Sequence, residues 1–294
     1  MDLIRDWILA NGDPGSWANA VIELIKLYLG AFFDFISEFA GDGMDATIKS
    51  AAAVPPLVFT AAFGLVAYLR HRDWKVAAIV VLGLLFVLYL SMWQKSIWEY
   101  MVATLVLVLY STLVSLLIGV PLGIYCARRP AVYNAVAPVL DLIQTMPSFV
   151  YLVPALALFG LGMVPAVVAT VIFAVAAPVR LTYLGVSQVP TALVEAGESF
   201  GCTRWQLLTK VKLPAALPTI MAGVNQTIML SLSMVVIAAL VGAPGLGVPV
   251  VRALAQANVK LGFDSGLAIV ALAIVLDRIL KQPKVRRRSS KAKA

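Results

Sequence analysis

Charged residues are scarce in this sequence. Only 13% of its 294 residues are Asp, Glu, Lys or Arg, and 61% are hydrophobic, whereas water-soluble domains are about a quarter charged and about half apolar. The sequence also has one histidine and two cysteines, too few for the usual zinc ligand sets. These shortages exclude an ordinary soluble domain and a structural zinc site.

Motifs for nucleotide and covalent chemistry are missing as well. No Gly-x-x-x-x-Gly-Lys-Ser/Thr phosphate loop occurs, so the chain is not expected to bind or hydrolyse ATP itself. The glycine-rich runs at 160–162 and 242–247 lack the strand–helix setting of a dinucleotide site. The single histidine, His71, stands between two arginines, where we expect a solvent-facing side chain rather than a catalyst. No enzyme activity, cofactor or metal is therefore predicted.

Long uncharged runs, by contrast, are abundant. A membrane-spanning helix needs about 20 apolar residues, and five uncharged runs are long enough to cross a bilayer. The predicted fold is an all-α, polytopic membrane protein with about seven transmembrane helices, a kink near Pro121 and a short outside helix at 250–262. The seven spans are expected at 51–69, 76–93, 100–127, 132–159, 165–185, 217–241 and 264–281.

The first 50 residues form an acidic segment, with eight acids and three bases. Within 17–40 the charged residues fall on one face of a helix, and the summed transfer energy for spanning is near zero. We therefore predict an amphipathic helix that lies in the membrane interface, with scaffolding of an assembly and packing against the spans both left open as its role. The charges are Glu23, Lys26, Asp34 and Glu38. No cleaved secretion signal is expected, because the first residues are acidic.

Basic residues gather in a few short segments between the spans and in the tail 282–294, which we expect to be disordered. With seven spans, all of these clusters fall on one side and the acidic N-terminal segment falls on the other. The positive-inside rule makes the basic side cytoplasmic, and this distribution records topology rather than nucleic-acid binding. Cys126 and Cys202 fall on that side too, so no disulfide is expected. The basic clusters are Arg70/Arg72/Lys75, Arg128/Arg129, Arg204/Lys210/Lys212 and the tail.

One stretch, 195–214, is polar within an otherwise apolar sequence. Its apolar residues recur at three- and four-residue steps, which predicts helix with one buried face. Gly201 and Thr203 suit a turn followed by an N-cap, and Pro214 is expected to end the second half. The apolar positions are Phe200, Trp205, Leu207, Leu208 and Val211. The stretch predicts a helix–turn–helix at the membrane surface.

The same stretch resembles the cytoplasmic loop signature of permease subunits of ATP-binding-cassette importers. The signature is Glu-Ala-x, three residues, Gly, nine residues, an aliphatic, one residue, Leu-Pro, and the chain departs from it only at Gly197, where alanine is usual. The resemblance implies that the loop 187–214 forms coupling helices that dock on an ATPase subunit. The residues expected to carry the coupling are Glu195, Ala196, Gly197, Ser199, Gly201, Arg204, Leu213 and Pro214.

From about residue 96 onward the chain is similar to the permease core of type I importers, which places that core at 96–281, after the two N-terminal spans in 51–95. Segments 144–154, 158–165 and 178–186 resemble the glycine betaine, proline betaine and choline branch. The resemblance implies a permease for quaternary ammonium solutes in the bacterial cytoplasmic membrane. It also implies a second copy of the permease, two ATPase subunits and an external solute-binding protein as partners.

Asp141 is the one carboxylate expected well inside a span, about 16 Å from its cytoplasmic edge at 1.5 Å per residue. Buried charges of this kind face a cavity or a partner. Asp141 therefore either lines a translocation pathway or pairs with a neighbour such as Gln144 or Thr145. The aromatic residues Phe149 and Tyr151 follow closely and suit a cationic solute.

An ion-coupled secondary transporter is the alternative function, although such proteins usually carry several buried ionisable residues. A membrane-embedded enzyme would need a catalytic set that is absent.

Overall fold

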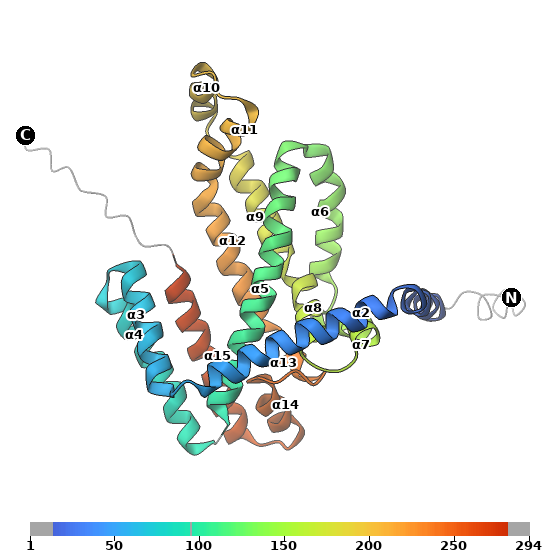
Figure 1. Cartoon of the computed structure of the whole chain (residues 1–294), viewed down its shortest axis with the longest axis vertical. Helices are drawn as coiled ribbons and strands as arrows, with labels where there is room; N and C mark the ends of the chain where they lie inside the picture. Colours follow the sequence, from blue (N-terminus) through green and yellow to red (C-terminus); the bar gives the residue numbers. More distant parts are fainter. Residues whose placement is uncertain (1–13, 95, 282–294) are drawn as a thin grey trace, which may run out of the picture.

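The computed structural model describes residues 14–94 and 96–281. Every regular element in these ranges is a helix, so the predicted all-α fold is confirmed. In Figure 1 helix α5 (Ile97–Arg128) runs through the middle of the molecule, with the other helices around it. The first 13 residues and the predicted basic tail 282–294 lie outside the described residues.

The N-terminal helix is longer than predicted. Helix α2 covers Pro14–Ala53 without interruption, so it includes the predicted 17–40 helix and crosses the expected boundary at residue 50. It ends just before Pro55, because proline disfavours helix in the residue before it. The next helix, α3 (Pro56–His71), is bent by 102° from α2, and the predicted start of the first span at residue 51 is therefore wrong.

Helix α2 lies across the bundle (Figure 1) and is fixed to it by specific contacts. Met44 is buried in a core cluster with α5, α7 and α8 residues. The Ser37 hydroxyl donates to the carbonyl of Phe159 at 3.2 Å, and the Thr47 and Tyr110 hydroxyls are 3.0 Å apart. These contacts make α2 part of the packed protein.

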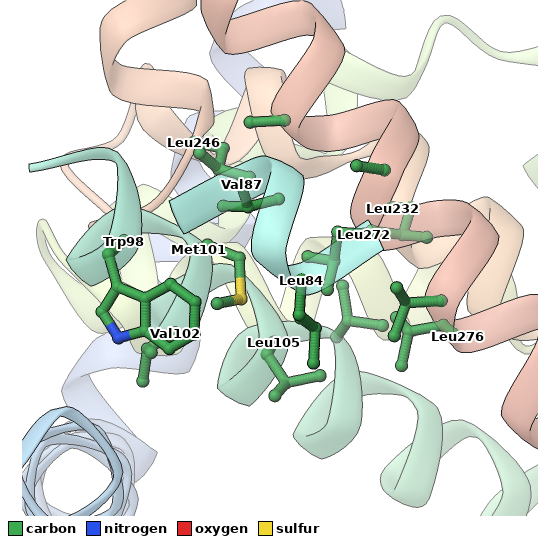
Figure 2. Packing of buried hydrophobic residues seen from close by; sticks show 14 of the residues in the cluster. Leu84, Val87, Trp98, Met101, Val102, Leu105, Leu232, Leu246, Leu272 and Leu276 are labelled. Atoms are coloured by element: carbon green, nitrogen blue, oxygen red, sulfur yellow. The ribbon is translucent and has the colours of Figure 1, made fainter. Parts of the chain in front are cut away.

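Helices α3, α4 (Trp74–Trp93) and α15 (Val259–Leu280) pack together on one side of α5. Figure 2 shows the core between them, in which side chains of α4, α5, α12 and α15 meet. Only 22% of the most apolar stretch of α4 is buried within the chain, so its outer face is available to lipid. His71, predicted to face solvent, is half-buried, with its Nε2 3.1 Å from the carbonyl oxygen of Ile279 at the end of α15.

On its other side α5 packs closely against α9 (Ala176–Ser187), and α9 packs against α12 (Leu213–Ser233). Gly119 and Gly123 face α9 so closely that an added Cβ would lie 2.6 Å from Pro178 and from the carbonyl of Val179. Helix α5 continues without interruption through Pro121, near which a kink is predicted, and the glycines serve the close approach of two helices.

The predicted fourth span, 132–159, is broken. Helix α6 (Pro130–Thr145) is followed by a 3-10 turn, η1 (Ser148–Tyr151), and α7 (Leu152–Phe159), with a bend of 105° between them. Pro147 explains the break, because it holds the preceding residue, Met146, in an extended conformation with ψ 141°. The fifth span is α8 (Met163–Ala174) continued by α9, close to the predicted 165–185.

The C-terminal part differs from the prediction mainly in its boundaries. Helix α12 is followed by α13 (Val235–Ala239), and the outside helix α14 covers Gly247–Ala255 rather than 250–262. Helix α15 begins five residues earlier than the predicted 264, because the Asn258 side chain accepts a hydrogen bond from the backbone of Leu261 and caps the helix.

Five helices of the described residues are long and apolar enough to cross a membrane, and the number rises to seven if each bent pair is one span. The bent pairs are α2 with α3 and α6 with α7. The predicted count of seven therefore agrees with the structure only when both bent pairs are counted as broken spans.

Candidate functional site

The polar stretch forms an end of the molecule, which we call the tip and define as residues 191–212. It consists of α10 (Thr191–Ser199), α11 (Arg204–Gln206) and a π-helical segment, η2 (Leu207–Lys212). In Figure 1 α10 and α11 extend beyond the ends of all the other helices, at the opposite end from α14. A second protein can therefore reach this surface without obstruction from the rest of the chain.

The predicted turn is present and is closed by hydrogen bonds on both sides. Gly201 has φ +76°, its N–H donates to Glu198 at 2.9 Å, and the N–H of Cys202 donates to Gly197 at 3.1 Å. This pair of bonds is a Schellman motif, which ends a helix with a glycine in the left-handed conformation. Thr203 and Gln206 then form a capping box that starts α11. The tip is therefore a preformed turn.

The prediction that Pro214 ends the second half of the stretch is wrong. The N–H of Leu213 donates to the carbonyl of Leu208, five residues back, and the chain passes from η2 straight into α12. Pro214 is the second residue of α12, and the helix continues through it. Leu213 keeps helical angles, φ −64° and ψ −46°. The tip is therefore connected to a membrane-spanning helix by continuous helix, which can transmit a displacement.

The predicted buried face is only partly buried. Leu207 and Leu208 are buried and Val211 is half-buried, as the helical spacing indicates. Phe200 and Trp205, however, are 89% and 64% exposed, because apart from the Arg128 guanidinium over Trp205 no other part of the described chain covers the end of the tip. Two large apolar side chains at a protruding turn favour a contact with another protein.

Gly197 is the buried residue of α10, and it explains the departure from the expected alanine. A Cβ at this position would lie 2.8 Å from Cδ1 of Leu207 and 3.3 Å from Cγ2 of Val211. The glycine therefore lets α10 pack directly on η2. Its cost in helix propensity, about 1 kcal/mol, is accompanied by closer packing of the two halves.

The tip brings most of the predicted coupling residues together. Apart from the buried Gly197, those on α10, at the turn and at the start of α11 are exposed, whereas Leu213 is half-buried against the cluster of Val186, Leu208 and Ala216 at the base of the tip. The exposed residues at the turn are Glu195, Ala196, Ser199, Gly201 and Arg204. Pro214 is exposed at the base, so Leu213 and Pro214 join the tip to α12 and lie apart from the turn.

A basic cavity of about 500 Å³ lies beneath the tip. Its charged lining is entirely cationic and comes from Arg128, Arg129, Arg204 and Lys212. The guanidinium of Arg128 stacks 5.7 Å from the ring centroid of Trp205, which links the end of α5 to the tip. This end of the molecule therefore concentrates positive charge, as the cytoplasmic ends of membrane proteins do.

Asp141 forms an ion pair with a residue that the sequence did not suggest. Its Oδ1 accepts a hydrogen bond from Nη2 of Arg180 on α9 at 2.5 Å. The predicted neighbours do not take this role, since the Thr145 hydroxyl donates to the carbonyl of Leu142 and no described contact joins Gln144 to Asp141. The pairing connects α6 with α9 inside the predicted spans.

The remaining residues predicted for the pathway lie in different surroundings. Thr145 and Phe149 are exposed, and Gln144 is half-buried. Tyr151 is buried in a core cluster, and its hydroxyl donates to the carbonyl of Ile143. The structure thus leaves Asp141, Thr145 and Phe149 accessible, and it packs Tyr151 inside the protein.

Sequence reasoning missed Arg180 and misplaced Phe200 and Trp205. Arg180 could have been found from a signal in the sequence, because it follows an uncharged run that begins at Leu142 and is a second charge expected within a span. The exposure of the two aromatic residues has no comparable signal, because helical spacing does not say whether a partner element covers a face.

Comparison with known proteins identifies the family. Residues 119–281 match the model of the binding-protein-dependent transport system inner membrane component. The chain is 48% identical to a glycine betaine/carnitine transport permease protein of Listeria monocytogenes, GbuB, over 90% of this chain and 93% of that protein. It is 44% identical to the glycine betaine transport system permease protein OpuAB of Bacillus subtilis, over 91% and 93% of the two chains.

A solved structure supports the fold independently. A chain of the MetNI methionine ABC transporter superposes with a TM-score of 0.54 at 24% identity, over 60% of this chain and 91% of that chain. This likeness concerns the fold alone and carries no information on the solute. The family match and the two sequence relatives show that the chain belongs to the family of inner-membrane components of binding-protein-dependent transport systems.

Proposed function

We propose that this chain is the permease subunit of an ATP-driven importer, and that the tip is the surface through which an ATPase subunit drives it. The observation that carries the proposal is the tip itself: a protruding turn, closed by a Schellman motif and a capping box, with Phe200 and Trp205 exposed. Continuous helix from η2 into α12 would convey its motion into the membrane. ATP hydrolysis would take place in the partner subunit.

The proposed solutes are quaternary ammonium compounds, namely glycine betaine, proline betaine or choline. The names of the relatives support this class, since GbuB is a glycine betaine/carnitine permease and ProW of Escherichia coli, 45% identical over 90% of this chain, is a glycine betaine/proline betaine permease. The exposed residues Asp141, Thr145 and Phe149 and the half-buried Gln144 are proposed to line the pathway, with Tyr151 behind them in the core.

The proposed assembly contains two copies of this chain, which span the bilayer. Two ATPase subunits and an external solute-binding protein complete it. The tip and the C-terminus would face the cytoplasm, with the N-terminal segment outside the cytoplasm. The charge distribution supports this orientation, because the α3–α4 turn and the end of α15 are at the helix ends that point away from α14, in the direction of the tip (Figure 1), and the basic cavity adjoins the tip itself. The positive-inside rule places such an end in the cytoplasm.

An ion-coupled secondary transporter is less well supported. Such transporters use several ionisable groups at mid-membrane, whereas Asp141 and Arg180 form the one ion pair among the described residues. The two functions are separated by co-purification. A tagged chain expressed with its associated ATPase gene should retain the ATPase in mild detergent, and recovery of the chain alone would favour the alternative.

Glu195→Arg tests the coupling role. Glu195 is exposed on α10, and its carbonyl accepts the hydroxyl of Ser199 at 2.8 Å, a bond that the substitution leaves in place. We expect ATP-dependent uptake in proteoliposomes to fall at least tenfold while the amount of permease in the membrane is unchanged. Glu198→Arg makes the same charge reversal three residues away and should lose less. Wild-type uptake by Glu195→Arg would contradict the proposed docking surface.

A further inference from the structure

The ion pair between Asp141 and Arg180 lies within the membrane-spanning part of the chain. Asp141 is eleven residues from the start of α6 at Pro130, and Arg180 is seven residues before the end of α9 at Ser187. At 1.5 Å per residue these separations are about 16 Å and about 10 Å. Both charged residues thus lie well inside their helices rather than at the helix ends, and charges at such depth in a membrane are usually functional.

The ion pair leaves the Asp141 carboxylate accessible and leaves hydrogen-bond donors of Arg180 without a partner among the described residues. The Asp141 side chain is 63% exposed and that of Arg180 is 34% exposed. Within residues 14–94 and 96–281, Arg180 makes its described bond through Nη2 alone, and its buried Nε has no hydrogen-bond partner. A guanidinium can hold a carboxylate with two parallel N–H bonds. Arg180 therefore has donor capacity to spare beside an accessible carboxylate.

Asp141 also belongs to a polar stripe on α6, formed by Asn134, Pro138, Asp141 and Thr145. At 100° per residue these positions fall within about 60° of one another, and all four are exposed. Pro138 has no N–H, so the carbonyl of Asn134 lacks its usual intrahelical donor. Polar groups of this kind are not tolerated against hydrocarbon. This face of α6 must therefore border water or another polar surface rather than lipid.

Apolar and aromatic contacts also hold α6 against α9. Leu140 of α6 is buried with Ala176 and Val179 of α9 in a separate apolar cluster. The rings of Tyr133 and Tyr183 also stack across the two helices, with centroids 3.5 Å apart. These contacts position Asp141 and Arg180 against each other, and they leave the charged groups free for another role.

From this geometry we infer that Asp141 and Arg180 form a zwitterion-recognition site in the translocation pathway, in which Arg180 binds the carboxylate of the solute and Asp141 faces its quaternary ammonium group. The inference rests on the proposed function and names the subset of solutes that the pathway prefers. A zwitterion replaces one internal ion pair by two matched contacts and leaves the site neutral. A simple cation such as choline leaves Arg180 without a solute carboxylate and adds a net charge in a low-dielectric region.

The first experiment separates this role from a structural one. The complete transporter, reconstituted with its ATPase and binding protein, is assayed for glycine betaine uptake with Asp141→Asn, Arg180→Gln and the exchanged pair Asp141→Arg/Arg180→Asp. Each single variant should lose at least tenfold in uptake while the amount of assembled complex is unchanged, and the exchanged pair should also assemble without regaining uptake. Asp45→Asn, the same change on an exposed carboxylate of α2, should match the wild type. Full uptake by the exchanged pair, or by both single variants, would overturn the inference.

The second experiment does not depend on the solute. In a Cys126→Ser/Cys202→Ser chain, Asp141→Cys is labelled in membranes with a methanethiosulfonate reagent that carries a trimethylammonium group. Labelling should be at least tenfold faster than at Met92→Cys, on the exposed side of α4. Equal or slower labelling would overturn the inference. Wild-type proteoliposomes that take up no betaine, together with fast labelling of Asp141→Cys, would instead show that the proposed solute class is wrong while the site faces water.

Discussion

Gly201→Trp is expected to abolish ATP-driven uptake while the permease still folds and reaches the membrane. A Cβ at Gly201 would meet no atom within 4 Å, so the first carbon of the tryptophan side chain has open space on this exposed turn. The substitution does place a large ring on the exposed turn, where an ATPase subunit is proposed to dock. The positive φ of +76° adds a backbone cost of about 1–2 kcal/mol for a residue other than glycine. Uptake into proteoliposomes and co-purification of the ATPase measure the effect.

Gly201→Asn is the matched control for that prediction. Asparagine tolerates the left-handed conformation better than other residues with a Cβ, so this variant tests the conformation with little added bulk. It should keep most of the uptake and the bound ATPase. If both variants transport like the wild type, the turn is not a docking surface. If both fail equally, backbone conformation rather than docking explains the loss.

Gly123→Ala is expected to destabilise the packing of α5 against α9. The added Cβ would lie 2.6 Å from the carbonyl oxygen of Val179 and 2.7 Å from Cβ of Thr182. One of these atoms is a backbone oxygen and the other is a Cβ bonded directly to the backbone. Neither can move unless α9 shifts away from α5. Overpacking of this kind costs about 1–3 kcal/mol. We expect less protein in the monodisperse peak after heating in detergent, followed by size-exclusion chromatography.

Gly266→Ala provides the comparison. Gly266 is also helical, in α15, but a Cβ there would meet nothing within 4 Å. Alanine favours helix over glycine by about 1 kcal/mol, so this variant should be as stable as the wild type or slightly more stable. A Gly123→Ala chain that resists heat as well as Gly266→Ala would show that α5 and α9 are not in close contact in the membrane.

Several features of the tip were predictable because they depend on neighbouring residues. Gly201 ends one helix, and Thr203 and Gln206, two and five residues later, start the next. Both signals lie within a few residues of sequence. The break at Pro147 was not predicted, although its cause is equally local. The uncharged runs predicted the spans because such long apolar stretches are unfavourable in contact with water, and about 20 apolar residues match the thickness of the bilayer core.

Other features depended on contacts between distant residues. The role of Gly119 and Gly123 became clear only when α9 was placed beside them. The partner of Asp141 lies 39 residues away along the chain. Phe200 and Trp205 are surface residues rather than core residues, because no described helix lies beyond the tip to cover them.

The sequence by itself determined that this protein is a bundle of membrane helices with a polar helix–turn–helix at one end. Composition, capping residues and glycine position act over a few residues, so they can be interpreted without a fold. Only the tertiary structure decided which faces of those helices are covered, which glycines are close contacts and which charges pair. These outcomes depend on the approach of helices that are far apart in the chain, and no local pattern specifies that approach.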